Sequence, residues 1–161
     1  MSPIPPLSAP LPIHSPGQEK IINACERHWN THKNNCSGFV YAVASNLGIS
    51  LPHVKANPMI DYIAAWTTPT WWKVSSPQHA GKYSEEGYFV VAGLKDESGS
   101  QNPHGHMVVV TSSHESANGI YPRGYWGKLG GVGMKNSTIN WAFEASDLAG
   151  GVTYWRHMAR R

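Results

Sequence analysis

The spacing of apolar residues changes once along this chain, near Trp66, and this change limits the possible folds more than any other feature of the sequence. Before Trp66, apolar residues recur at every third or fourth position, which is typical of one face of a helix. After it, short runs of β-branched and aromatic residues are separated by Gly, Ser, Asn and Pro, which is typical of strands. Helices followed by strands predict an α+β fold in which the N-terminal helices pack on one face of an antiparallel sheet.

Capping signals mark where the helices begin. Residues 15–18 read Ser-Pro-Gly-Gln, a capping box with proline at the first helical position, and they predict a helix that reaches about residue 30. A second helix is predicted to begin at Cys36, capped by Asn34 or Asn35, and to end before Gly48. The remaining predicted elements are a short helix after Asn57-Pro58 and strands at Trp71–Val74, Tyr88–Ala92, His106–Thr111, Ile120–Trp126 and Val152–His157.

The length and the position of the prolines predict one domain with an N-terminal arm. A chain of 161 residues fits one domain, since domains average ~100–200 residues. Six of the twelve prolines lie in the first sixteen residues. Because proline fixes φ and removes a backbone donor, residues 1–14 are expected to form an extended arm, and residues 15–161 a single domain.

Charge and hydropathy exclude several classes of protein. The net charge is +3 and the basic residues are scattered, whereas a nucleic-acid-binding protein would show a basic stripe. The longest apolar run, Tyr88 to Leu94, is far shorter than the ~20 residues of a membrane helix. The N-terminus lacks the basic and apolar regions of a Sec signal peptide, so any export is expected to use another machine. A mildly basic surface suits an anionic polymer such as bacterial cell wall.

The strongest chemical feature is Cys36 at the first turn of the second predicted helix. Unpaired backbone N–H groups and the helix dipole stabilise a thiolate there, and the same amides can hold an oxyanion. Gly38 allows a substrate or a neighbouring backbone to approach closely. These features favour Cys36 as a nucleophile with a lowered thiol pKa.

A thiol nucleophile needs a base, and the sequence offers His106 at the start of a buried-looking strand. His104 lies two residues earlier, but Gly105 and Pro103 disfavour a strand that extends back that far, so His106 is favoured. The group that would orient His106 stays unassigned, because the next strand offers only Tyr121, Arg123 and Tyr125, and His114 lies in a loop. A backbone carbonyl would serve equally well.

Other readings of these residues stay open. Cys25 lies in the middle of an apolar stripe and is interpreted as a core residue. A Cys25–Cys36 disulfide would occupy the better nucleophile. His28 and His32 have a spacing of four residues but lack the glutamate of a zinc motif, so no metal or other cofactor is predicted. The alternative outside the enzymes is a non-catalytic domain that binds cell wall through its aromatic residues.

Two motifs, in this order along the chain, resemble those of a known family. Asn35–Val40 reads N-C-S-G-F-V at a helix start, and about seventy residues later Gly105–Val110 reads G-H-x-x-V-V at a strand start. This pair resembles the NlpC-type cysteine peptidases of the papain-like superfamily. The chain resembles the type VI secretion amidase effectors more closely, through further matching segments at Asn23–Cys25, Ala56–Met59, Gly87–Lys95 and Tyr125–Gly127.

The resemblance implies a peptidoglycan amidase with a Cys-His dyad. Cys36 would attack a carbonyl of a stem peptide, and His106 would take the thiol proton and return it to the leaving amine. Asn35, Ser37 and Gly38 would contact the substrate. The bond implied is γ-D-glutamyl–meso-diaminopimelate, and the alternative is the diaminopimelate–D-alanine crosslink.

The resemblance also implies a setting. The protein would be an antibacterial toxin, made in the cytoplasm and delivered by the type VI system to the periplasm of a recipient cell. It would act as a monomer, with the stem peptide and a cognate immunity protein as partners.

One departure from the family pattern suggests a hypothesis. Many NlpC-type enzymes have an aspartate immediately before the nucleophile, which pairs with the free amine of an N-terminal L-alanine. Here that residue is Asn35, which carries no charge. The enzyme is therefore expected to accept stem peptides that are still attached to muramic acid.

Overall fold

Three helices precede every strand, as the spacing of the apolar residues predicts. The computed structural model describes residues 14–65, 70–99, 105–113 and 120–161, so most of the predicted N-terminal arm lies outside the described residues. The helices are α1 (Pro16–His32), α2 (Cys36–Asn46), α3 (Ala56–Ala65), α4 (Pro77–Glu85), the 3-10 helix η1 (Ile139–Trp141) and α5 (Ala145–Gly150). The strands are β1 (Trp71–Val74), β2 (Tyr88–Leu94), β3 (His106–Ser112), β4 (Arg123–Trp126), β5 (Met134–Thr138) and β6 (Thr153–Arg160).

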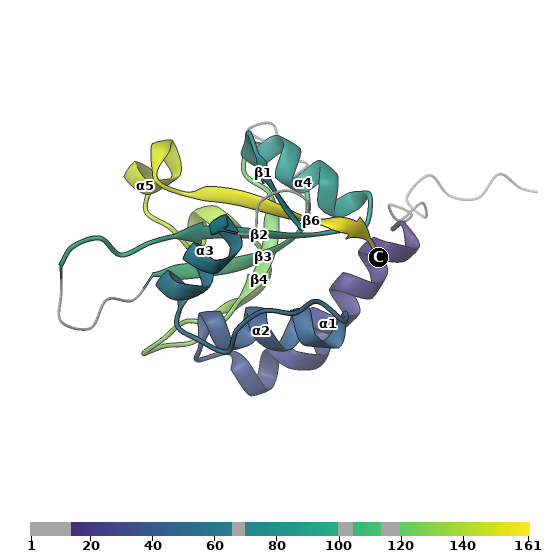
Figure 1. The fold of residues 1–161 in the computed structure, drawn as a ribbon, viewed down its shortest axis with the longest axis horizontal. Helices are drawn as coiled ribbons and strands as arrows, with labels where there is room; N and C mark the ends of the chain where they lie inside the picture. The colour runs from purple at the N-terminus through teal and green to yellow at the C-terminus, as the bar shows by residue number, and fades with distance from the viewer. Residues whose placement is uncertain (1–13, 66–69, 100–104, 114–119) are drawn as a thin grey trace, which may run out of the picture.

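The six strands form one antiparallel sheet in the order β1-β6-β2-β3-β4-β5. The α+β class predicted from the sequence is confirmed (Figure 1). Strands β2 and β3 lie at the centre, and their register places His106 opposite Leu94. The start of β3 therefore lies beside the end of β2.

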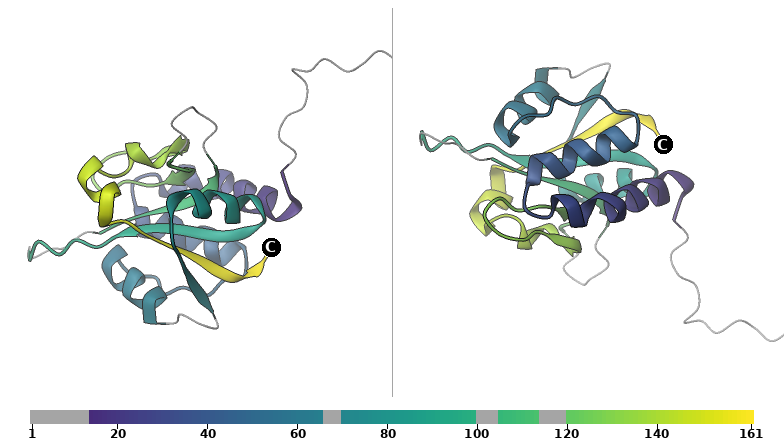
Figure 2. Two further views of the ribbon diagram at one scale, coloured as in Figure 1. Left: turned by 90° about the horizontal axis from the view of Figure 1, so that it is seen from above. Right: turned by 90° about the horizontal axis from the view of Figure 1, so that it is seen from below.

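The predicted N-terminal helices α1, α2 and α3 pack together on one face of the sheet, as expected, whereas α4, a helix that the sequence pattern did not predict, packs on the opposite face. Figure 2 shows α4 in front of the strands in one view and the first three helices in front in the other. Alternate residues of the central strands divide between the two cores: Val91 and Val109 pack with α1–α3, whereas Val90 and Val110 pack with Ala80 of α4. Both faces of the central strands are consequently apolar and buried.

Local side-chain bonds explain why α1 and α2 begin where they do. The Ser15 hydroxyl accepts a hydrogen bond from the Gln18 backbone N–H at 3.1 Å, as the capping box predicts. The Gln18 side chain does not reach back; its amide donates to the Thr111 carbonyl at 2.9 Å and ties α1 to β3. Asn35, rather than Asn34, caps α2, and Gly48 follows the helix with a φ of 76°.

Candidate active site

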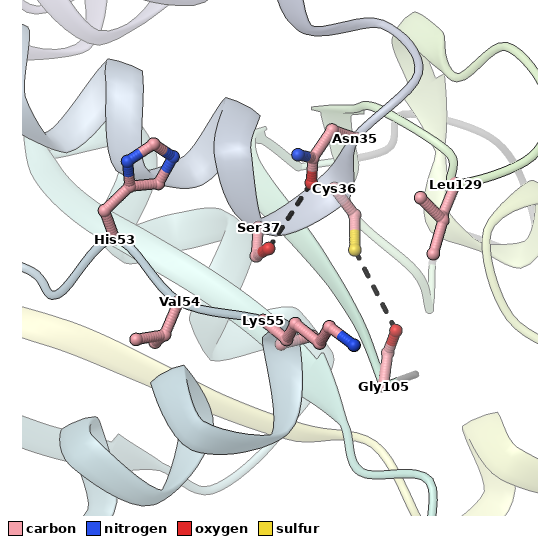
Figure 3. Close-up of a pocket in the computed structure, with 9 residues that line it drawn as sticks. Asn35, Cys36, Ser37, His53, Val54, Lys55, Gly105 and Leu129 are labelled. Carbon is pink, nitrogen blue, oxygen red and sulfur yellow. Dashed lines mark hydrogen bonds between the residues drawn. The ribbon is translucent and has the colours of Figure 1, made fainter. Parts of the chain in front are cut away.

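Cys36 is the first residue of α2, and its thiol faces the start of β3. The side chain is 5% exposed, and Sγ lies 3.9 Å from the carbonyl oxygen of Gly105, to which the thiol donates (Figure 3). Gly105 immediately precedes His106. The helix start and the strand start, about seventy residues apart in the sequence, therefore meet at the thiol.

Gly105 fits this position only because it has no side chain. A Cβ there would lie 2.4 Å from Asn57 Oδ1 and 2.6 Å from the carbonyl oxygen of Leu94. Asn57 is itself fixed, since its amide donates to the Asp96 carbonyl and its oxygen accepts from the Asp96 N–H, both at 2.9 Å. Asn57 of helix α3 thus contacts both the segment after β2 and Gly105 at the entry to β3.

His106 is the first residue of β3, as predicted, and it lines a cavity together with Cys36. Its ring makes an edge contact with Phe143, with centroids 5.3 Å apart and an interplanar angle of 67°. Tyr125 does not serve His106, because its hydroxyl donates to Glu26 at 2.6 Å. His104 and His114, also considered from the sequence, lie outside the described residues.

Burial decides the protonation of both residues. It lowers the pKa of His106 to about 4, and the positive charge of Lys128 acts in the same direction. Burial also raises the pKa of the Cys36 thiol, although the backbone N–H groups of Met107, Ser37 and Cys36 itself lower it. The amides act as the sequence predicts, but desolvation outweighs them. The expectation of a low thiol pKa is therefore wrong for this structure, in which thiol and imidazole are both neutral at pH 7.

The cleft around Cys36 has two lobes that share Cys36, Gly105 and Leu129. The first, here called the α3 lobe, has a volume of about 290 Å³ and is shown in Figure 3. Its other lining residues are Asn35, Ser37, His53, Val54, Lys55 and Ala56. The second, here called the hairpin lobe, has a volume of about 250 Å³. Its other lining residues are His106, Trp126, Lys128, Trp141 and Ala142.

The three residues expected to contact substrate occupy different positions. Asn35 and Ser37 line the α3 lobe. Gly38 is not among the residues that line either lobe, and its N–H donates to Asn35 Oδ1 at 3.0 Å. A Cβ on Gly38 would lie 2.8 Å from Asn35 Nδ2, so the glycine lets the capping side chain lie close to the helix.

The glycine-rich segment 127–133 forms a tight turn between β4 and β5. The N–H groups of Lys128 and Gly133 both donate to the carbonyl of Lys33, at 3.0 and 2.8 Å. A Cβ on Gly127 would lie 2.2 Å from the carbonyl oxygen of His32, so the turn lies directly against the connection between α1 and α2. These contacts hold Lys128 and Leu129 at the cleft.

The sequence pattern did not point to Lys55 or Trp141 as cleft residues, whereas Lys128 and Leu129 lie in the glycine-rich segment 127–133, whose composition favours a loop beside a cleft. Leu129 and Trp141 are apolar side chains that are 53% and 70% exposed. Such exposure beside a cavity is a signal of a binding surface, but it is visible only once the fold is known.

The remaining candidates from the sequence have structural explanations. Cys25 is fully buried in the core, as predicted, and both cysteines are free thiols. The imidazole of His28 is hydrogen-bonded to Asn46 Oδ1 at 3.0 Å. Among the described residues, no three His, Cys, Asp or Glu side chains gather as metal ligands would, and no helix is long and apolar enough to span a membrane.

Comparison with known proteins finds one similar sequence of known activity. The chain is 36% identical over 99 residues to the peptidoglycan amidase Tse1 of Pseudomonas aeruginosa PAO1. The match covers 57% of this chain and 58% of the length of Tse1. No family model matches the chain. The chain is thus similar to a peptidoglycan amidase over more than half of its own length.

Proposed function

We propose that this chain is a peptidoglycan amidase, a cysteine hydrolase of the NlpC type in the papain-like superfamily, with Cys36 as nucleophile and His106 as base. The observation that carries this proposal is that Cys36 and His106, remote in sequence, line the same lobe of one cleft. A nucleophile at a helix start and an imidazole at a facing strand start are the two groups that thiol hydrolysis requires. The similarity to Tse1 gives the substrate class.

The neutral state of both groups determines how the reaction would begin. Cys36 Sγ attacks the peptide carbonyl while His106 removes the thiol proton, so that no free thiolate accumulates beforehand. The tetrahedral intermediate then collapses, and His106 gives the proton to the leaving amine. Water, deprotonated by His106, hydrolyses the acyl-enzyme and regenerates the thiol.

The first turn of α2 supplies the donors for the oxyanion. The N–H groups of Gly38 and Phe39 are already bonded to Asn35, the first to its side chain and the second to its carbonyl. The backbone N–H groups of Met107, Ser37 and Cys36 all act to lower the pKa of the Cys36 thiol. Of these, the Cys36 and Ser37 amides belong to the first turn of α2, and we propose them as donors for the negative oxygen formed on the carbon that the sulfur attacks.

The bond that we propose is γ-D-glutamyl–meso-diaminopimelate, on the basis of the resemblance to the type VI secretion amidase effectors. In this proposal, residues 15–161 form one domain that acts as a monomer. Its role is that of an antibacterial toxin, delivered by type VI secretion to the recipient periplasm and neutralised in the producing cell by an immunity protein that covers the cleft.

The test is a digest of crosslinked meso-diaminopimelate sacculi, resolved by chromatography and mass spectrometry. The wild type is expected to release disaccharide-dipeptides and crosslinked fragments that lack the first two residues of one stem, and C36A and H106Q are expected to release neither. C25A is the matched control, because it removes a thiol that lies outside the cleft.

Two other results would change the proposal. Loss of crosslinked dimers without shortened stems would place the cut at the diaminopimelate–D-alanine crosslink and retain the dyad. An unchanged profile, with sacculi that still bind the wild type and C36A equally, would identify a wall-binding domain without catalysis.

A further inference from the structure

Two lysines lie on opposite sides of the nucleophile, and the chemistry of the proposed substrate distinguishes them. We infer that Lys128 binds the free carboxylate of the diaminopimelate side chain and thereby selects diaminopimelate over lysine in the third position of the stem. This inference rests on the proposed cut between γ-D-glutamate and diaminopimelate. It assigns a role in substrate specificity to Lys128, a residue outside the Cys36–His106 dyad.

The position of His106 determines which half of the substrate occupies each lobe. The imidazole must donate a proton to the leaving amine, so the leaving half lies on the His106 side of the thiol. His106 lines the hairpin lobe and not the α3 lobe. Diaminopimelate, which carries the leaving amine, therefore occupies the hairpin lobe, and γ-D-glutamate occupies the α3 lobe beside Lys55.

Lys128 is the cationic side chain among the described residues that line the hairpin lobe, and no described acidic residue lines it. The side-chain ion pairs in the described part of the chain join Lys95 to Asp61 and Lys135 to Glu26, so neither involves Lys128. The backbone of Lys128 is fixed by its bond to Lys33, and its aliphatic stem lies over Gly131. The ammonium group is thus presented from an anchored backbone.

The surroundings favour a charged partner for this ammonium group. Trp126, Trp141 and Leu129 line the same lobe as Lys128, which is exposed, and a charge pair beside apolar side chains is stronger than one in open water. The positive charge of Lys128 also acts on His106, whose pKa it helps to lower. A carboxylate bound at Lys128 would offset that charge and make His106 a stronger base. Recognition of the correct substrate would then also promote the first proton transfer.

The substrate itself provides a matched comparison, because meso-diaminopimelate is lysine with one additional carboxylate on the side-chain end. Two N-acetylated tetrapeptides, L-Ala-γ-D-Glu-X-D-Ala with X as meso-diaminopimelate or L-lysine, differ in that carboxylate alone. Their kcat/KM values are measured by release of N-acetyl-L-Ala-D-Glu. A charged hydrogen bond in such a site predicts that the wild type prefers the diaminopimelate peptide by about ten- to a hundredfold.

The variants separate recognition from general damage to the site. K128M is expected to remove the preference by slowing hydrolysis of the diaminopimelate peptide while leaving that of the lysine peptide within about threefold of the wild type. K128R, which keeps the charge, is expected to retain most of the preference. K55M is the control in the other lobe, and it should leave the ratio unchanged because the two peptides are identical on that side. Thermal unfolding of each variant verifies that it is folded.

Three results would overturn the inference. Equal hydrolysis of both peptides by the wild type would mean that the carboxylate is not recognised, although the proposed function would stand. A preference that survives in K128M would assign recognition to another residue. Hydrolysis of neither peptide, together with unchanged sacculi, would overturn the proposed function as well.

Discussion

The middle of α1 and the start of α2 each place a cysteine in the same apolar core, yet the two thiols have different chemical surroundings. Cys25 is 0% exposed and Cys36 is 5% exposed, and burial raises the pKa of both. Around Cys25 nothing opposes that effect, and the charge of Glu26 adds to it. Around Cys36, three backbone N–H groups oppose it and a cleft lies beside the sulfur. Position in the helix, more than burial, distinguishes the proposed nucleophile Cys36 from the core residue Cys25.

Replacing each of the two cysteines by alanine in turn is the most severe test of this comparison. C36A is expected to lower the hydrolysis of sacculi by at least about a thousandfold, because it removes the thiol that we propose forms the acyl-enzyme. C25A should keep hydrolysis within a few fold and instead lower the free energy of unfolding by about 1–2 kcal/mol, because it leaves a small cavity in the core. Muropeptide release and urea unfolding measure the two effects. The reverse pattern would contradict the assignment of the nucleophile.

The carbonyl that faces Cys36 offers the next test. G105A places a Cβ 2.4 Å from Asn57 Oδ1, and since Asn57 is held by two hydrogen bonds the strand entry must shift. We expect a loss of about 2–3 kcal/mol in unfolding free energy and a fall in activity beyond that explained by unfolding. G150A in α5 is the control, since a Cβ there meets nothing within 4 Å. Equal stability of both variants in urea would show that the strand entry is not constrained.

Alkylation by iodoacetamide compares the two thiols directly. A raised thiol pKa leaves less thiolate at pH 7, so Cys36 should react more slowly than free cysteine there and should react faster as the pH rises. Cys25 should not react until the protein unfolds. Peptide mapping by mass spectrometry gives the two rates. Rapid alkylation of Cys36 at pH 6 would instead indicate a thiolate paired with an imidazolium.

The residue that caps α2 has a smaller effect. N35A removes the acceptor for the Gly38 N–H and should cost about 1 kcal/mol in unfolding free energy. N35D keeps the cap, so its stability should match that of the wild type. If the uncharged Asn35 explains acceptance of stems attached to muramic acid, the wild type will cleave N-acetylated peptides, and N35D will shift the preference toward peptides with a free amine. A wild type that cleaves only free-amine peptides would contradict this.

The smallest expected effect concerns the acidic limb of the pH profile. In the proposed mechanism the base is neutral His106, whose pKa is lowered to about 4, so kcat/KM should hold from neutral pH to about 5 and fall below that. Because the charge of Lys128 contributes to the lowering, K128M should move this limb to higher pH. The measurement is kcat/KM for the lysine peptide between pH 3 and 8. A limb that stays in place would mean that the two side chains do not interact.

Much of the fold could be predicted because its signals are local. The bond between Ser15 and Gln18 and the Asn35 cap lie within four residues of sequence, and β1 begins and ends where its composition predicts. Helix α4 was missed because its buried residues are Ala80, Gly81 and Ser84, which form no apolar stripe. Strand β5 was missed because it is polar and largely exposed.

The sequence by itself determined the starts of α1 and α2, the strand-rich second half and the two residues most suited to thiol chemistry. These follow from capping, composition and position at the ends of elements, which act over a few residues. Only the tertiary structure decided that α4 covers the second face of the sheet, that Gly105 fits beneath Asn57, and that Lys55 and Lys128 lie on either side of the thiol. It also decided the protonation of Cys36 and His106, because desolvation depends on every neighbour that excludes water, and those neighbours come from distant parts of the chain.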